Sequence, residues 1–322
     1  MIALQNFRLS ATGTRIYYCF VFGGLGGATG WFIAAMVLHA GAGHLDLFGQ
    51  AFQGAILGSL IGFSIGAVDG VSFGSLPRAI KFGGVALILG ALGGAIALPA
   101  AQYLYDTLRP VEAPGAATTG FGSILVGILC WMVFGGLIGL GEGFGKGSQT
   151  WKGLLGGLFG GALGGGIYES IGRSTVGSMS PAEQELLALA VCILGGFVGS
   201  SIALVTTILK DAWLVVDSGK LKGTEINISK YVDKELGSRR PGIIGSSQWD
   251  ANIYLPGDSE ILGRHASISY KDGLPTLTAS PEAVERKKAT MVNGRQISTR
   301  PLSNGDRLQI GSTTLIYRHK KR

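Results

Sequence analysis

Six long apolar stretches occupy the first two thirds of the chain, and short alternating segments follow them. Charged residues occur in these stretches only close to an end, and the stretches lie near 16–40, 48–71, 80–103, 120–141, 153–172 and 186–209. A helix needs ~20 apolar residues to cross a bilayer, so each stretch is long enough, or nearly so, for a membrane span. The fifth is the weakest, because glycine lowers its hydropathy. The alternative, a soluble core of apolar helices, would leave too little polar surface.

Beyond Trp213 the pattern changes to short alternating segments separated by turn signals. The turns include Asp217-Ser218-Gly219, Lys271-Asp272-Gly273 and Asn304-Gly305-Asp306. Many short strands without a helical period predict a β-sandwich. The sequence therefore predicts a multidomain chain with a cytoplasmic N-terminal segment (1–15), a six-helix, glycine-rich transmembrane domain (16–209) and a cytoplasmic β-sandwich domain (210–322).

The charges follow the same division. Residues 1–209 carry eight basic and eight acidic side chains, so the net charge of +7 belongs to the β domain. A basic domain joined to apolar spans favours an anionic membrane surface, rather than nucleic acid, as its neighbour. Glycine occupies 55 positions and cysteine only three, which excludes a disulfide scaffold.

Loop charges predict the orientation of the spans. Lys and Arg favour the cytoplasmic side of a membrane. They gather before the first stretch and after the second, fourth and sixth, as Arg8, Arg15, Arg78, Lys81, Lys146, Lys152 and Lys210. We therefore expect a multi-pass protein of the cell membrane with both termini in the cytoplasm. One alternative is a cleaved signal peptide ending near Ala40 or Ala42, although the first stretch is long for that role.

Glycine recurs at every fourth position in several stretches. The second stretch carries Gly54, Gly58, Gly62, Gly66, Gly70 and Gly74. Small residues at this spacing let helix backbones approach closely in lipid, where no hydrophobic force drives association. The stripes therefore predict tight helix packing, and the alternative is a glycine-lined pathway for a solute or ion.

An internal repeat links the even-numbered stretches to the stretches that follow them. Gly66, Asp69, Gly70, Ser75 and Gly83-Gly84 recur with the same spacing as Gly139, Glu142, Gly143, Ser148 and Gly156-Gly157, and a fainter third copy begins at Gly196. The repeat predicts a helix pair that is used three times. Asp69 and Glu142 fall at the cytoplasmic ends of their spans, where we expect structural ion pairs or helix caps.

The β domain carries a series of motifs in a recognisable order. These are Ile244-Gly245, Asn252-Ile253-Tyr254-Leu255-Pro256, His265-Ala266-Ser267-Ile268, Val292-Asn293-Gly294 and the run from Leu302 to Gly311. Over about residues 213–318 the chain resembles a forkhead-associated (FHA) domain. The resemblance implies a β-sandwich whose loops at one end bind phosphothreonine peptides, and thus a recognition module, not an enzyme.

The chain departs from the family at the positions that usually contact phosphate. Ser246 stands where the family has Arg, Leu262 where it has Ser, and Lys288 where it has Asn. Candidate contacts for a phosphopeptide or another protein are Ser246, Ser247, Arg264, Lys287, Lys288 and Asn293, with His265, Gly245 and Gly294 in structural roles. Two interpretations stay open: phosphothreonine binding by substituted charge-assisted donors, and phosphate-independent protein contact.

Other chemistry is not indicated. The sequence has no phosphate-binding loop, dinucleotide fingerprint or zinc-protease motif, and Cys19, Cys130 and Cys192 are scattered within spans. We expect no metal, no cofactor and no catalysis. The favoured interpretation is a membrane-anchored signalling scaffold that binds a protein partner, linked to a Ser/Thr kinase. The alternative is a channel or transporter with a regulatory FHA-like domain, and the oligomeric state is left open.

Overall fold

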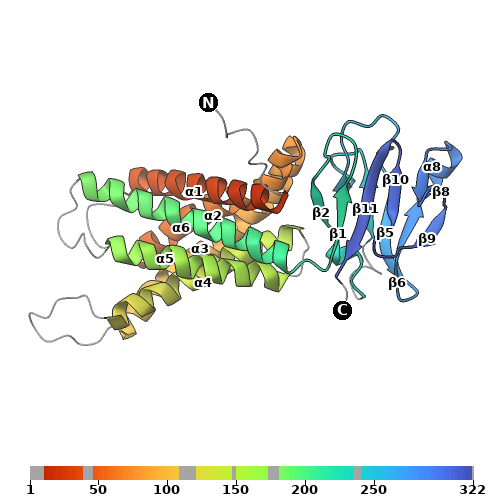
Figure 1. The fold of residues 1–322 in the computed structure, drawn as a ribbon. Helices are drawn as coiled ribbons and strands as arrows, with labels where there is room; N and C mark the ends of the chain where they lie inside the picture. Colours follow the sequence, from red (N-terminus) through yellow and green to blue (C-terminus); the bar gives the residue numbers. More distant parts are fainter. Residues whose placement is uncertain are drawn as a thin grey trace, which may run out of the picture. The chain divides into compact units, whose positions relative to one another are not determined.

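The computed structural model describes residues 11–38, 46–108, 121–146, 150–172, 181–234 and 241–320, and the chain divides into two compact units (Figure 1). The helical unit comprises Gly13–Ser72 and Arg78–Ile208, and the second unit contains Leu209–Arg322. Arg8, Ala40, Ala42 and Ser148 lie outside the described residues, so the predictions made for them stay predictions.

Six helices make up the described part of the helical unit. They are α1 (Ala11–Leu38), α2 (Leu47–Ser72), α3 (Leu76–Leu108), α4 (Phe121–Lys146), α5 (Thr150–Gly172) and α6 (Pro181–Ile208). Five of them, all except α5, are long and apolar enough to cross a membrane. The structure therefore has a helical N-terminal region with five candidate spans, whereas the sequence predicts six. The helix that is missing from the five is the one whose hydropathy glycine lowers most.

Glycines bring neighbouring helix backbones into contact. A Cβ atom added to Gly58 in α2 would lie 2.1 Å from the carbonyl oxygen of Gly90 in α3. A Cβ atom added to Gly139 in α4 would lie 2.1 Å from the carbonyl oxygen of Gly153 in α5. Real Cβ atoms essentially never come this close to another heavy atom, so only glycine permits these crossings. The stripes thus face neighbouring backbones.

Helix α5 carries glycine on two faces. Gly157 faces the carbonyl oxygen of Gly135 in α4, and Gly160 faces Val198 in α6. Small residues on both sides let α5 lie close to two helices at once, which explains why its sequence is poor in large apolar side chains.

Helix α1 is an integral member of the unit. A Cβ atom added to Gly23 would lie 2.3 Å from the carbonyl oxygen of Gly195 in α6, so the first helix packs closely on the last. It begins at Ala11, ahead of the predicted residue 16, and this places Arg15 within the helix. Retention of the first helix, in place of removal as a signal peptide, stays a prediction.

Arg15 connects four helices. Its guanidinium group lies 3.5 Å from the carboxylate of Asp69 in α2 and 3.7 Å from that of Glu142 in α4. The same group donates hydrogen bonds to the hydroxyls of Thr206 and Thr207 in α6, at 3.3 and 3.4 Å. The carboxylates of Asp69 and Glu142 therefore share one cation from α1, whereas the repeat predicted for their segments stays a prediction.

The interior of the helical unit is an apolar cluster. Its largest fully buried side chains come from α2, α4 and α6, and they are Ile61, Ile65, Phe134, Ile138, Leu194 and Ile202. Dispersion contacts between such side chains stabilise association in lipid. The unit thus combines a centre of large side chains with glycine contacts between helix pairs.

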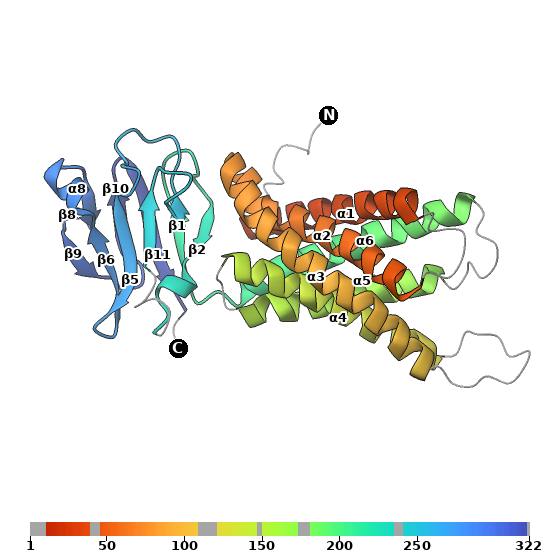
Figure 2. The same ribbon diagram turned by 180° about the vertical axis from the view of Figure 1, so that it is seen from behind.

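The second unit is a β-sandwich, as the sequence predicts. One sheet has the order β2-β1-β11-β10-β7-β8 and the other β4-β3-β5-β6-β9, and Figure 2 shows β5, β6 and β9 side by side. The strands are β1 (Ala212–Val216), β2 (Glu225–Asn227), β3 (Gly242–Gly245), β4 (Ile253–Tyr254), β5 (Ala266–Lys271), β6 (Leu274–Ala279), β7 (Thr290–Val292), β8 (Arg295–Gln296), β9 (Thr299–Pro301), β10 (Arg307–Ile310) and β11 (Thr313–His319).

The core of the sandwich follows the alternation of its strands. Leu214 and Val216 of β1, Leu315 and Tyr317 of β11 and Ile268 of β5 are all buried in one cluster. Neighbouring positions on β1 and β11 are only partly buried. Because successive side chains on a strand point to opposite faces, this alternation directs one face of each sheet into a common core. The short helix α8 (Pro281–Glu285) and the loops are carried on this framework.

Candidate partner-binding site

Three loops of the sandwich meet where β3 ends, β5 begins and β7 begins. The backbone amide of Ser246, just after β3, donates to the carbonyl oxygen of Leu262 at 3.0 Å, and that of Ser247 donates to Gly263 at 3.3 Å. The loop that carries α8 joins them, since Lys288 forms an ion pair with Glu260 at 2.6 Å. Five of the six predicted contact residues therefore lie in one group of adjoining loops.

Gly245 permits the first of these contacts. A Cβ atom added at this position would lie 2.0 Å from the carbonyl oxygen of Gly263. A side chain here would push apart the end of β3 and the loop before β5. This close approach requires glycine at residue 245.

His265 ties two of the loops together from inside the domain. Its ring is fully buried, and Nδ1 accepts a hydrogen bond from the backbone amide of Leu262 at 3.2 Å. Because Nδ1 is an acceptor, Nε2 carries the proton and lies 3.2 Å from the Ala289 carbonyl oxygen and 3.1 Å from the Thr290 hydroxyl. Burial lowers the pKa of His265, which keeps the ring neutral in this arrangement. Its role is positional.

The two predicted serines already have partners within the domain. The hydroxyl of Ser246 donates to the carbonyl oxygen of Ile261 at 2.8 Å, and that of Ser247 donates to the carboxylate of Asp250 at 2.8 Å. A ligand would have to replace these hydrogen bonds to receive either proton. The serines thus shape the loop after β3.

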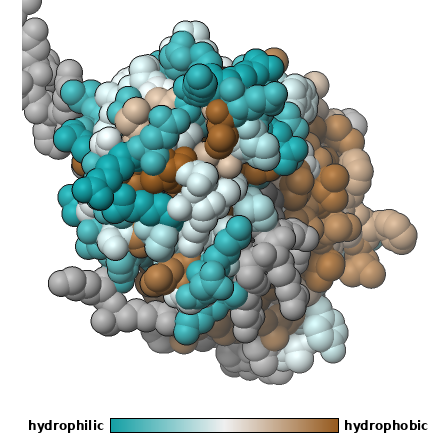
Figure 3. Space-filling view, turned by 90° about the vertical axis from the view of Figure 1, so that its right-hand side faces the viewer, coloured by the Kyte–Doolittle hydropathy of each residue, from teal (hydrophilic) through white to brown (hydrophobic). Residues whose placement is uncertain are grey.

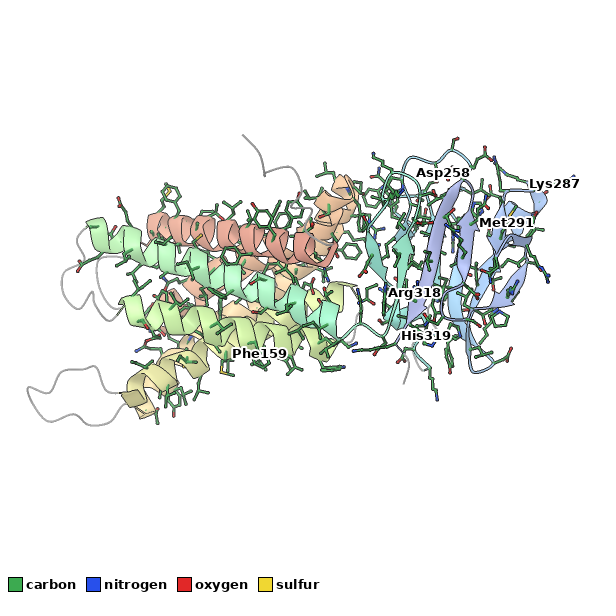
Figure 4. All side chains as sticks on the ribbon, in the orientation of Figure 1. Phe159, Asp258, Lys287, Met291, Arg318 and His319 are labelled. Carbon is green, nitrogen blue, oxygen red and sulfur yellow. The ribbon has the colours of Figure 1, made fainter. Side chains whose placement is uncertain are left out.

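Arg264 and Lys287 present the available positive charge. Both side chains are exposed, and neither makes an ion pair with another described residue. Lys287 projects outward from the end of α8 in the stick view (Figure 4). Its backbone is held in the left-handed region, at φ 50°, where its amide donates to the Val284 carbonyl oxygen and closes the short helix. In contrast, Lys288 is neutralised by Glu260.

Asn293 and Gly294 lie at the other end of β7 from Lys288. The side-chain carbonyl of Asn293 accepts from the backbone amide of Arg307 at 2.8 Å, and its amide donates to Asp306 at 2.8 Å. Both residues have positive φ, 53° and 77°, as a two-residue hairpin turn requires. Asn293 and Gly294 therefore form the turn between β7 and β8, and Asn293 does not lie in the loops that carry the other candidates.

The sequence reasoning missed Trp249. This side chain lies in the loop after β3 and is 67% exposed. The space-filling view shows mainly hydrophilic side chains with a few hydrophobic patches among them, and a continuous hydrophobic area along its right side (Figure 3). The signal available in the sequence was a tryptophan within a polar loop, next to the candidate serines.

No group of three or more potential metal ligands occurs among His, Cys, Asp and Glu residues in the described ranges. The arrangement thus offers hydrogen-bond donors, two cations and one aromatic side chain, which suit the binding of another molecule.

Part of the chain is similar to known proteins. Residues 242–311 match the FHA domain family. Similar solved structures include an FHA domain studied for phosphothreonine-dependent interactions (23% identity, 35% of this chain and 99% of that chain, TM-score 0.27). Another is the FHA domain of the CT664 protein from Chlamydia trachomatis (25% identity, 34% and 99%, TM-score 0.28). A third is the FhaA FHA domain complexed with the intracellular domain of Rv3910 (23% identity, 33% and 99%, TM-score 0.26). No curated protein matches the chain.

Proposed function

We propose, on the basis that residues 242–311 form an FHA domain preceded by several apolar helices, that this protein is a membrane-anchored scaffold that binds a protein partner. FHA domains are phosphothreonine-dependent protein-interaction modules. The partner would dock on the loops around Ser247, Arg264 and Lys287 and be held at the membrane. The protein would act by binding alone, without catalysis, in a pathway that depends on a Ser/Thr kinase.

One observation carries the binding proposal. The loops are held in position by the close contact of Gly245 with Gly263 and by the buried His265. They display Arg264 and Lys287, which form no ion pair with another described residue. A preorganised loop set loses little conformational freedom on binding. Two exposed cations attract an acidic group, and a phosphothreonine carries about −1.5 to −2 charges at neutral pH.

The phosphate dependence is expected to be modest. Tight phosphate binding needs several convergent charge-assisted donors. Ser246, Ser247 and Lys288 already have partners in the domain, which leaves Arg264 and Lys287. We therefore propose that an acidic or phosphorylated residue of the partner contacts these two side chains, and that other contacts supply the rest of the affinity.

A direct test uses the full chain in detergent with fluorescent peptides from a randomised library centred on phosphothreonine or on threonine. Binding would be followed by fluorescence anisotropy. We expect detectable binding that Arg264→Gln and Lys287→Gln each weaken about tenfold, in line with one lost charged hydrogen bond, while Lys271→Gln, an exposed lysine at the far end of β5, has no effect. Absence of binding to every peptide of both libraries would refute the proposal.

The membrane proposal rests on the apolar surface of the helical unit. Large side chains such as those of Phe32, Met36, Ile96 and Phe159 are more than half exposed. In water such a surface would drive aggregation, whereas lipid solvates it. If both termini are cytoplasmic, as the loop charges indicate, the number of spans must be even. In that case α5 crosses the membrane in addition to the five candidate spans, and its close glycine contacts with α4 and α6 shield it from lipid.

Topology mapping tests this part. Reporter fusions after Lys146 and after Gly172 should give opposite sides if α5 crosses the membrane. The same side for both positions would mean that α5 does not cross. We do not propose transport as a second function, because the described helices pack large apolar side chains at their centre and glycine against backbone between them.

A further inference from the structure

Trp249 is an exposed tryptophan on a rigid turn. The hydroxyl of Ser247 donates to the carboxylate of Asp250 at 2.8 Å and accepts from the Asp250 amide at 3.2 Å. The amide of Ala251 donates to the carbonyl oxygen of Ser247 at 3.2 Å, and Ala251 is buried. Trp249 therefore lies on a closed turn that is anchored at both ends, so its backbone position is defined although its side chain is 67% exposed.

This turn adjoins the loop of Arg264. The amide of Ser247 donates to the carbonyl oxygen of Gly263 at 3.3 Å, and a Cβ atom on Gly263 would lie 3.6 Å from that of Ser247. Trp249 is two residues from Ser247, and Arg264 follows Gly263. Because an extended peptide advances ~3.3–3.6 Å per residue, a segment of a few residues is long enough to contact both side chains.

The side chains of Trp249 and Arg264 indicate the chemistry of the ligand. Trp249 offers a large apolar surface with little conformational entropy to lose, which is the property of residues that dominate protein interfaces. Arg264 offers a planar cation with no ion pair to another described residue. Trp249 is not part of the buried cluster of the sandwich, and most of its side chain is exposed.

We infer that Trp249 is the apolar specificity residue of the binding site. The partner segment carries an aromatic or large aliphatic side chain that packs on Trp249, and an acidic or phosphorylated residue, a few positions away, that pairs with Arg264. This inference rests on the proposed function, and it adds which partner sequences the site selects.

The test measures sequence preference with the full chain in detergent. An array holds phosphothreonine, aspartate or threonine at a central position and places phenylalanine or alanine at each flanking position in turn. We expect the wild-type protein to prefer phenylalanine at one flank by at least about tenfold, which is the effect of an interface hot spot. Trp249→Ala should abolish this preference, and Trp249→Phe should retain part of it.

Leu274→Ala is the matched control. Leu274 is 51% exposed, begins β6 and pairs with Lys271 at the end of β5 that is opposite the candidate loops. Its loss should therefore leave the flank preference unchanged. A preference that survives in Trp249→Ala, or a wild-type protein that binds peptides with no flank preference, would overturn the inference and leave the proposed function standing. Absence of binding throughout the array would overturn both.

A second measurement distinguishes a peptide from a lipid surface. Trp249→Cys would be reacted with a water-soluble maleimide in nanodiscs that contain phosphatidylserine. Free reaction without peptide, and protection by the preferred peptide, are the expected results. Protection by the nanodisc alone would assign Trp249 to the membrane surface and overturn the inference.

Discussion

Alanine substitutions at two glycines of α3 should distinguish the role of glycine in close helix packing from its low helix propensity. A Cβ atom at Gly90 would lie 2.2 Å from the carbonyl oxygen of Gly58, whereas a Cβ atom at Gly84, in the same helix, meets nothing within 4 Å. Alanine has a higher helix propensity than glycine by about 1 kcal/mol. At Gly84 the gain in helix propensity is the only contribution to the change in stability that we expect, so Gly84→Ala should stabilise the helix or leave its stability unchanged.

At Gly90 the steric term outweighs the propensity. Ordinary contact begins near 3.4 Å, so α2 and α3 must move apart by about 1 Å, and the matching contact of Gly54 with Gly94 opens with them. Forcing a methyl group into a packed interface costs about 1–3 kcal/mol. After the gain in propensity, we expect Gly90→Ala to lower the free energy of unfolding by up to about 2 kcal/mol, and to be less stable than Gly84→Ala by about 1–3 kcal/mol.

The assay is unfolding of the full chain in dodecylmaltoside micelles by added dodecyl sulfate, followed by the helical circular dichroism signal. The comparison of the two variants removes the common effect of alanine. Equal stability of Gly90→Ala and Gly84→Ala would refute the reasoning, because it would mean that the backbones of α2 and α3 do not touch in the membrane-mimetic state.

Three further predictions concern single side chains. Arg15→Gln should lower the free energy of unfolding of the helical unit by about 2 kcal/mol, because it leaves the buried carboxylate of Glu142 without this cation. In a double-mutant cycle with Glu142→Gln, the two losses should not add. Additive losses in the same detergent assay would contradict the pairing. Lys287→Gly should raise the unfolding free energy of the β unit by about 0.5–1 kcal/mol, because glycine adopts φ 50° without strain. Equal melting temperatures for Lys287→Gly and Lys287→Ala would exclude that strain. Burial lowers the pKa of His265 below its unfolded value of about 6.5, so its contribution to the free energy of unfolding should be complete above that pH and decline as the pH falls. The denaturant midpoint of His265→Gln should therefore depend less on pH than that of the wild type. An equal pH dependence in both proteins would show that another group is responsible.

The local pattern of apolar and polar residues was sufficient to predict the division of this protein into a helical region and a β-sandwich. Runs of apolar residues predict helices, and alternation with turn residues predicts strands, because both depend on neighbours within a few positions along the chain. The six apolar stretches correspond to the six described helices, and the region after Trp213 is a β-sandwich. The FHA motifs likewise sit in continuous runs, so a resemblance over about residues 213–318 could be predicted from sequence, and residues 242–311 match the family.

The candidate site shows what such patterns leave undecided. Ser246, Lys288 and Asn293 are equally polar in the sequence, yet each already has a partner within the fold. Among the six candidate residues, only Arg264 and Lys287 are cations without an ion pair to another described residue. Which donors remain available depends on residues distant in sequence, such as Glu260 for Lys288, and no local rule specifies those pairs.

The sequence by itself determined where the apolar helices lie, where the β-sandwich begins and which family the sandwich belongs to, because hydrophobic period and short motifs are properties of neighbouring residues. Only the tertiary structure decided that Arg15 serves both Asp69 and Glu142, that α1 closes on α6, and that Trp249 stands exposed beside the Arg264 loop. These facts depend on which distant segments come together. Packing and hydrogen bonding across the whole fold, not adjacency along the chain, select that arrangement.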